Sequence, residues 1–103
     1  MLKETNLDEN TLVIFTSDNG GSLPHAQSNG KLRGGKLDMY EGGIRVPAFF
    51  YWKNKIEPGT ITENFAMLMD LFPTFCELAN VEHSNEIDGI SILPTLLKDG
   101  GVG

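Results

Sequence analysis

The chain has 103 residues and a net charge of −6, with 8 Lys and Arg against 14 Asp and Glu, and it contains one cysteine. One cysteine excludes an internal disulfide framework and a cysteine-based zinc site, and the negative charge argues against general binding to nucleic acid. No apolar run approaches the roughly 20 residues of a membrane helix. Residues 1–10 contain no apolar signal-peptide core. From the length of the chain we expect one domain with a modest core.

The first half of the chain predicts two strands separated by a long loop. Residues 11–16 are continuously apolar or β-branched, which is typical of a strand covered on both faces, as in a parallel α/β sheet. Residues 17–46 show no helical or strand period and contain seven of the twelve glycines, so they predict a large functional loop. Residues 47–52 (PAFFYW) predict a second strand, which Pro47 can begin.

The second half predicts one main helix. Residues 61–69 fit a third extended segment, and Asp70 is the expected N-cap of a helix that runs to about residue 79. Within that helix, Cys76 lies between apolar neighbours and is expected to be a buried, inert thiol.

The remaining residues predict little regular structure. A polar loop at 80–88 precedes an apolar segment at 90–97 that begins a short helix at Leu93, and residues 100–103 are expected to be a frayed end. The chain thus has two or three strands, about one and a half helices and a loop larger than any of them. So few elements around so large a loop are unusual for a domain that folds by itself. We therefore interpret the chain as part of a larger α/β domain.

Asp18 and Asn19 directly follow the first predicted strand. The carboxyl ends of strands are where open α/β sheets bind ligands, and a carboxylate beside an amide carbonyl offers hard oxygen ligands for Ca²⁺ or Mg²⁺. The alternative is structural, because Asp-Asn-Gly-Gly is also a standard turn composition.

The glycine-rich loop is locally basic. Gly34 and Gly35 let the backbone come close to a bound group, so together with the cations they predict an oxyanion cradle, and the alternative is a solvated basic loop. His25 lies in the same loop and is a candidate for contacting substrate or transferring a proton, unless it is merely exposed. Half of the chain's Lys and Arg residues lie within 15 residues here: Lys31, Arg33, Lys36 and Arg45.

Five motifs extend over nearly the whole chain: TSDNGG at 16–21, RGGK at 33–36, YEGGIRVP at 40–47, MDLFPT at 69–74 and DGISILP at 88–94. In this order and spacing they resemble the type I sulfatases of the alkaline-phosphatase-like superfamily. Each motif alone is weak, whereas the combination is specific. The resemblance implies an α/β fold class, namely a fragment of an alkaline-phosphatase-like three-layer domain with few strands, one main helix and a long glycine-rich loop.

The resemblance also implies a sulfuric ester hydrolase. Sulfatases hydrolyse sulfate esters with a formylglycine nucleophile, made from Cys or Ser in a C/S-x-P/A-x-R motif, and a bound divalent cation, usually Ca²⁺, holds the sulfate oxygens. By family match, Asp18 and Asn19 would be two of the Ca²⁺ ligands. Lys36 would be catalytic, binding the sulfate and stabilising transition-state charge, and His25 would contact the substrate.

The sequence departs from the family pattern in several places. Cys76 is followed by Glu-Leu-Ala rather than by the formylglycine motif, the family's upstream metal-binding Asp and catalytic His and Lys are absent, and Leu37 stands where the family often has Gly. We therefore expect residues 1–103 to be a C-terminal part of the catalytic domain that lacks the formylglycine-containing part and is inactive alone. Glu41 and Arg45 are interpreted as bracing the loop.

The leading interpretation is thus a segment of a sulfatase that acts on a sulfated small molecule or glycan, with neither a nucleic acid nor a membrane as partner. Two alternatives stay open: a related phosphomonoester or phosphonate hydrolase with a Thr or Ser nucleophile, and a non-catalytic interaction module. Unpaired strand edges favour self-association of the fragment. The resemblance implies a periplasmic, secreted or lysosomal compartment.

Overall fold

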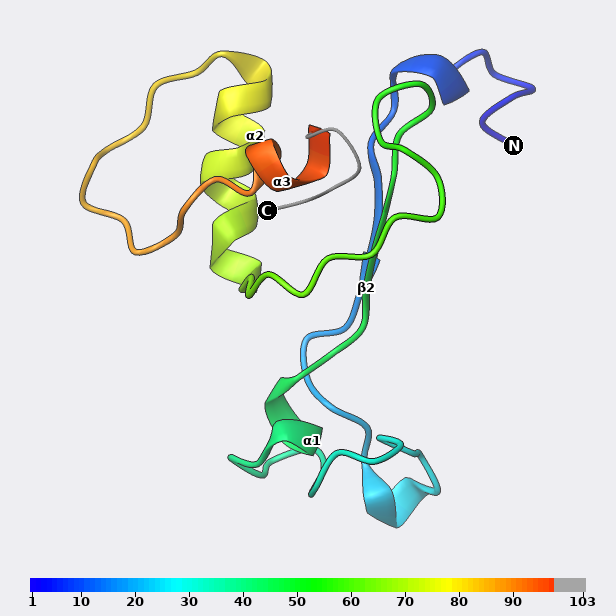
Figure 1. Cartoon of the computed structure of the whole chain (residues 1–103), viewed down its shortest axis with the longest axis vertical. Helices are drawn as coiled ribbons and strands as arrows, with labels where there is room; N and C mark the ends of the chain where they lie inside the picture. The colour runs from blue at the N-terminus through cyan, green and yellow to red at the C-terminus, as the bar shows by residue number, and fades with distance from the viewer. Residues whose placement is uncertain (98–103) are drawn as a thin grey trace. The chain divides into compact units, whose positions relative to one another are not determined.

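The computed structural model describes residues 1–97, so the expected frayed end at 100–103 lies outside the described residues. The chain forms two compact units, one of residues 14–49 and one that joins residues 1–13 to the part that begins at residue 50. In chain order (Figure 1), the elements are η1 (Asp8–Asn10), β1 (Val13–Thr16), η2 (Leu23–His25), α1 (Glu41–Ile44), β2 (Ala48–Tyr51), η3 (Leu68–Asp70), α2 (Leu71–Ala79) and α3 (Leu93–Leu97), in which η marks a 3-10 helix.

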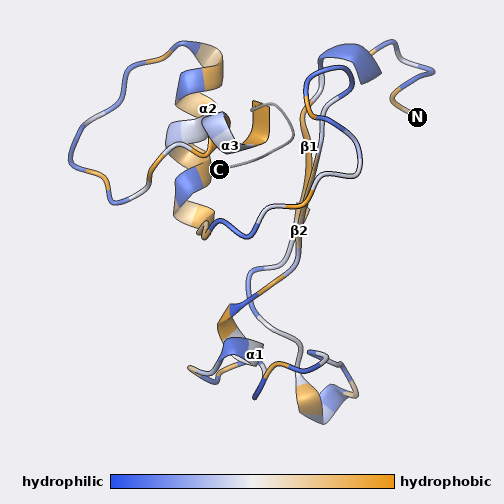
Figure 2. Ribbon diagram, viewed as in Figure 1, coloured by the Kyte–Doolittle hydropathy of each residue, from blue (hydrophilic) through white to orange (hydrophobic). Residues whose placement is uncertain are grey.

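Both predicted strands are confirmed, and β1 and β2 pair with each other in a two-stranded sheet. The strands run in opposite directions (Figure 1), so the expected parallel arrangement is wrong for this pair. The cover expected on both faces of β1 is not supplied within residues 1–97, because Phe15 is 66% exposed, and Phe49 on β2 is 64% exposed. Their ring centroids lie 6.1 Å apart, and the apolar residues of both strands appear in orange in Figure 2.

Residues 17–46 are mainly loop, as expected, but they include the short helices η2 and α1. Helix α1 contains Gly42 and Gly43, both of which are buried. Glycine is a poor helix former, which explains why the sequence does not predict α1. The helix is held by tertiary contacts instead, since the Gly42 N–H donates to the Arg33 carbonyl over 2.7 Å.

The predicted main helix is confirmed as α2, and the predicted short helix from Leu93 is confirmed as α3. Asn80, with φ 54°, ends α2 in the left-handed conformation that Asn tolerates. Cys76 is buried, as expected, with 9% of its surface exposed. Residues 61–67 do not form a third strand, and the segment ends instead in η3.

Asp70 precedes α2 as predicted, but its side chain does not cap the helix. The carboxylate accepts the backbone N–H of Met67 over 2.7 Å and that of Ile90 over 2.9 Å. Thr74, which is fully buried, continues this connection: its hydroxyl donates to the Asp70 carbonyl over 2.6 Å and accepts the Ile92 N–H over 2.9 Å. Two polar side chains therefore hold the stretch before α3 against α2.

A second long-range connection in the same unit joins η1 to the residues after β2. The Lys53 ammonium donates to the Asp8 carboxylate over 2.9 Å and to the Glu9 carboxylate over 3.0 Å. The hydrogen bond from Lys53 holds the pKa of the Asp8 carboxyl below its usual range, and the same contacts raise the pKa of Lys53. Ion pairs near the surface contribute modestly to stability.

Replacing Thr74 by valine keeps the shape of the side chain but removes the hydroxyl. We expect a loss of about 1–3 kcal/mol of unfolding free energy, because the partly buried Ile92 N–H is left without its acceptor. Urea unfolding followed by Trp52 fluorescence measures the loss. The control is Thr95→Val, since within residues 1–97 the Thr95 hydroxyl only accepts a 3.4 Å bond from Asn64 near the surface. Equal stability of the two variants would contradict the assigned role of Thr74.

Candidate functional site

The turn after β1 carries the two predicted metal ligands where they were expected, at the end of the strand. The Ser17 hydroxyl donates to the Asn19 carbonyl over 2.8 Å, and the Asn19 Nδ2 donates to the Gly20 carbonyl over 2.8 Å. Because the amide nitrogen of Asn19 is engaged with the backbone, its Oδ1 is the atom left for a ligand. Asp18 is exposed, so consecutive residues of the turn carry a carboxylate and an amide oxygen.

Backbone packing fixes this turn against α1. The Gly20 N–H donates to the Gly43 carbonyl over 2.8 Å. A Cβ atom on Gly20 would lie 1.7 Å from the Gly42 carbonyl oxygen, and one on Gly42 would lie 2.1 Å from the Gly34 carbonyl oxygen. The glycines of the loop therefore allow the chain to pack closely on itself.

Lys36 lies beside the same turn. Its backbone N–H donates to the Gly21 carbonyl over 2.9 Å, and its side chain is exposed. The preceding Gly35 is buried, and a Cβ atom there would lie 2.5 Å from the Gly21 carbonyl oxygen. The lack of a side chain at Gly35 therefore allows the backbone of the turn that carries Asp18 to pack against it.

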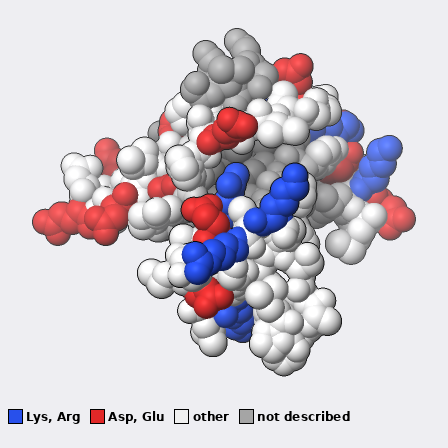
Figure 3. Space-filling view, turned by 60° about the horizontal axis from the view of Figure 1, so that its bottom comes forward, with Lys and Arg blue, Asp and Glu red and all other residues white. Residues whose placement is uncertain are grey.

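The other cations of the basic loop are partly engaged. The Arg33 guanidinium lies 3.8 Å from the centre of the Tyr40 ring, and Arg45 forms an exposed ion pair with Glu41 over 3.7 Å, one helical turn apart. The predicted bracing role of Glu41 and Arg45 thus appears as a contact between the two, of small energy because both are solvated. Figure 3 shows Lys and Arg side chains interspersed with acidic ones.

His25 lies in η2, and its ring is exposed. Its Nδ1 is 2.7 Å from the Ser22 hydroxyl, and its backbone N–H donates to the Ser22 carbonyl over 3.1 Å. Within residues 1–97, no hydrogen bond or ion pair joins the side chains of the four predicted site residues to one another, and no cluster of three His, Cys, Asp or Glu residues could hold a metal. The structure connects Lys36 to the turn through one backbone hydrogen bond, from the Lys36 N–H to the carbonyl of Gly21, which lies two residues after Asn19.

Sequence reasoning missed Asn29, whose side chain connects these backbones. Its Oδ1 accepts the Gly21 N–H over 2.7 Å, while its Nδ2 donates to the carbonyls of Gly21 and Gly34 over 3.1 and 3.0 Å. The signal was present but ambiguous, because Asn before Gly30 is also a common turn composition. The sequence also did not indicate a role for Asp38, whose carboxylate accepts the Gly35 N–H over 2.7 Å.

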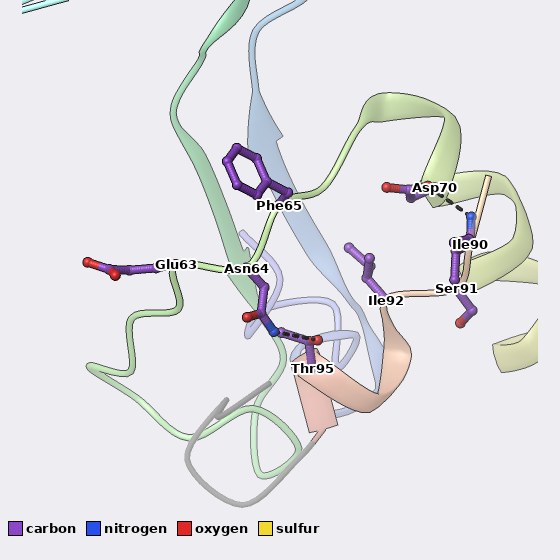
Figure 4. A pocket seen from close by; sticks show the side chains of 8 residues that line it. All are labelled: Glu63, Asn64, Phe65, Asp70, Ile90, Ser91, Ile92 and Thr95. Carbon is purple, nitrogen blue, oxygen red and sulfur yellow. Dashed lines mark hydrogen bonds between the residues drawn. The ribbon is translucent and has the colours of Figure 1, made fainter. Parts of the chain in front are cut away.

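A pocket of about 450 Å³ lies in the other unit (Figure 4). Two of its polar residues are hydrogen-bonded, since Asp70 accepts the Ile90 N–H and Asn64 donates to Thr95. The pocket is lined by Glu63, Asn64, Phe65, Asp70, Ile90, Ser91, Ile92 and Thr95.

Among the residues that the structure describes, no helix is long and apolar enough to cross a membrane.

Similarity to characterised proteins is consistent along the chain. Residues 1–81 match the family Sulfatase. N-acetylgalactosamine-6-sulfatase of Mus musculus is 39% identical over 104 residues, which cover 95% of this chain and 20% of that protein. Steryl-sulfatase of Mus musculus is 40% identical over 108 residues, which cover 95% of this chain and 17% of that protein. The chain thus spans about one fifth of the length of the curated relatives it matches.

Solved structures of related proteins superpose on most of this chain. The crystal structure of Ps i-CgsB in complex with k-i-k-neocarrahexaose superposes with a TM-score of 0.89 at 37% identity, over 94% of this chain and 22% of that one. The PsFucS1 sulfatase from Pseudoalteromonas sp. superposes with a TM-score of 0.86 at 39% identity, over 99% of this chain and 22% of that one. The fold is therefore that of part of an alkaline-phosphatase-like α/β domain, with two strands and one main helix. This chain belongs to the sulfatase family.

Proposed function

We propose that this chain is a C-terminal segment of the catalytic domain of a sulfate ester hydrolase, in which Asp18 and Asn19 hold Ca²⁺, Lys36 binds the sulfate group and His25 contacts the substrate. One observation carries the proposal: the hydrogen bond from the Lys36 N–H to the Gly21 carbonyl, which supports placing a cationic side chain beside two oxygen ligands. The family match favours this interpretation over a phosphoester hydrolase or an interaction module.

The donor set of the turn fits calcium. The Asp18 carboxylate and the Asn19 Oδ1 are hard oxygen donors, and the Asn19 Nδ2 is already engaged with the Gly20 carbonyl. Calcium takes 6 to 8 oxygens, so water and other parts of a sulfatase would complete its shell. When bound, Ca²⁺ would polarise the sulfate oxygens and neutralise their charge.

Lys36 and His25 have separate roles in the proposal. The Lys36 ammonium is a compact charge that donates hydrogen bonds to the sulfate oxygens and stabilises the negative charge that grows on them during transfer. His25 uses Nδ1 toward Ser22, which leaves Nε2 to form a hydrogen bond with the group that carries the sulfate. The backbone hydrogen bond from Lys36 to Gly21 and the side-chain hydrogen bonds of Asn29 lie within residues 14–49 and support this arrangement.

Cys76 does not fit the role of the formylglycine nucleophile. It is buried on α2, and Glu77, Leu78 and Ala79 follow it in place of the family motif. No chemical step is therefore assigned to it. We expect residues 1–103 alone to be inactive and to associate with other copies through exposed strand residues such as Phe15 and Phe49. Turnover of an aryl sulfate by the purified chain would contradict this expectation.

The substrate proposed is a sulfated sugar. The supporting observation comes from two solved relatives: the Ps i-CgsB complex holds k-i-k-neocarrahexaose, and the BT4656 structure holds its substrate D-glucosamine-2-N,6-O-disulfate. BT4656 superposes with a TM-score of 0.79 at 31% identity, over 96% of this chain. The substrate held by BT4656 is a sulfated sugar, which supports the same substrate class for this chain.

Replacing Asp18 by alanine tests the metal assignment. In a sulfatase-length polypeptide that contains this sequence, we expect Asp18→Ala to weaken Ca²⁺ binding more than about tenfold, because a charged ligand is lost. Isothermal titration of the chelator-treated protein measures the affinity. Glu41→Gln is the control, since it removes an exposed carboxylate of the same unit that, among the residues described, pairs only with Arg45. Unchanged calcium affinity in Asp18→Ala would overturn the assignment.

A further inference from the structure

We propose that Asn29 is a positioning residue that sets Lys36 against the turn carrying Asp18 and Asn19; this inference rests on the proposed function. The side chain of Asn29 is half-buried and lies within the loop that separates the two. It touches neither metal nor substrate in the proposal, and it acts through the backbone atoms it binds.

The geometry uses every polar atom of the Asn29 amide. The Oδ1 accepts the Gly21 N–H over 2.7 Å, and the Nδ2 donates to the Gly21 carbonyl over 3.1 Å and to the Gly34 carbonyl over 3.0 Å. Because N–H groups can only donate and carbonyls can only accept, these three partners fix the orientation of the amide. One side chain thus joins the turn after β1 to the glycines that precede Lys36.

The Gly21 carbonyl is the point at which the two parts meet. It accepts the Nδ2 of Asn29 over 3.1 Å and the backbone N–H of Lys36 over 2.9 Å. Gly21 is two residues from Asn19, and Gly34 is two residues from Lys36. A change in the Asn29 contacts therefore shifts the base of Lys36 relative to the oxygen ligands, and small misplacements of catalytic groups have large kinetic costs.

No other residue type reproduces this pattern. Aspartate has the same shape and still accepts the Gly21 N–H, but it places a carboxylate against the two carbonyls that Asn29 now donates to. Asn29→Asp is therefore the sharpest variant. Ser28→Ala is the matched control, because the neighbouring Ser28 hydroxyl only accepts the exposed Gly30 N–H over 3.2 Å.

The main experiment is a double-mutant cycle in a sulfatase-length polypeptide that contains this sequence, with an aryl sulfate as the probe. We expect Asn29→Asp to lower kcat/KM about 10–100-fold, and less than about 2-fold when Lys36 is already alanine, because the effect acts through Lys36. Ser28→Ala should leave kcat/KM unchanged in both backgrounds. The same loss in both backgrounds, or no loss in either, would overturn the inference.

Hydrogen exchange in the 103-residue chain provides a readout that does not depend on activity. We expect Asn29→Asp to accelerate exchange of the Lys36 amide at least about tenfold, because the shared Gly21 carbonyl is displaced. Unchanged exchange would overturn the inference alone, leaving the calcium and sulfate assignments intact. A fully active Lys36→Ala variant would instead overturn the proposed function and, with it, the inference.

Discussion

Replacing Lys36 by alanine should lower kcat/KM for a sulfate ester about 100–1000-fold in a sulfatase-length polypeptide that contains this sequence. The substitution removes a positively charged hydrogen-bond donor from the place where negative charge grows in the transition state. Removing one such donor from other enzymes lowers the rate by a similar factor. Steady-state kinetics with an aryl sulfate measure it. Calcium affinity, titrated in parallel, should change less than about threefold, because Lys36 is not a metal ligand in the proposal.

Lys31 offers a control from the same loop. It is exposed, like Lys36, but the structure gives its backbone no hydrogen bond to the turn that carries Asp18, within the residues described. Lys31→Ala removes the same charge from the loop and should leave kcat/KM within about twofold, since exposed charges are screened. If Lys31→Ala and Lys36→Ala lost equal activity, a general basic loop would explain the data better than a specific sulfate ligand.

Replacing Gly20 by alanine should unfold most of the unit formed by residues 14–49. A Cβ atom on Gly20 would lie 1.7 Å from the Gly42 carbonyl oxygen and 2.9 Å from the Gly43 Cα, and both are backbone atoms of α1. Backbone cannot turn aside as a flexible side chain can, so the turn and α1 must separate. We expect a loss of more than about 3 kcal/mol, at the upper end of single-substitution effects.

Amide hydrogen exchange in the 103-residue chain measures this loss locally. The Gly20, Lys36 and Gly42 amides, which donate across the unit, should lose their protection in Gly20→Ala. The control is Gly30→Asn, because Gly30 has φ 61°, which Asn tolerates, and nothing lies within 4 Å of the added Cβ. Retained protection in Gly20→Ala would show that the glycine contacts do not hold the site.

Local patterns were sufficient for several elements. The helix after Asp70 and the short helix from Leu93 are confirmed as α2 and α3, because the residue types that start a helix and give it an apolar side act within a few residues of the chain. The two strands are confirmed because β-branched and aromatic runs favour extended backbone. Helix α1 could not be predicted, since it depends on glycines that only tertiary contacts stabilise.

In the candidate site, too, local patterns identified some residues, whereas contacts between distant residues could not be predicted. Asp18, Asn19, His25 and Lys36 were identified from residue type and motif, and their roles stay predictions. The connection between them could not be read from the sequence, because Asn29 binds Gly21, which is eight residues away, through a geometry that no spacing rule specifies. Asp70 is a similar case: its type predicted a cap, but its carboxylate binds Ile90, which is 20 residues away.

By itself, the sequence determined the family, the α/β class and the positions of the main helix and strands, because these depend on residue types that act locally or recur in fixed motifs. Only the tertiary structure decided that β1 and β2 are antiparallel neighbours and that the glycines serve close packing of the backbone. It also decided that Lys36 stands beside the turn after β1. The physical reason is that these features depend on contacts between distant parts of the chain, where the absence of a side chain matters as much as its chemistry.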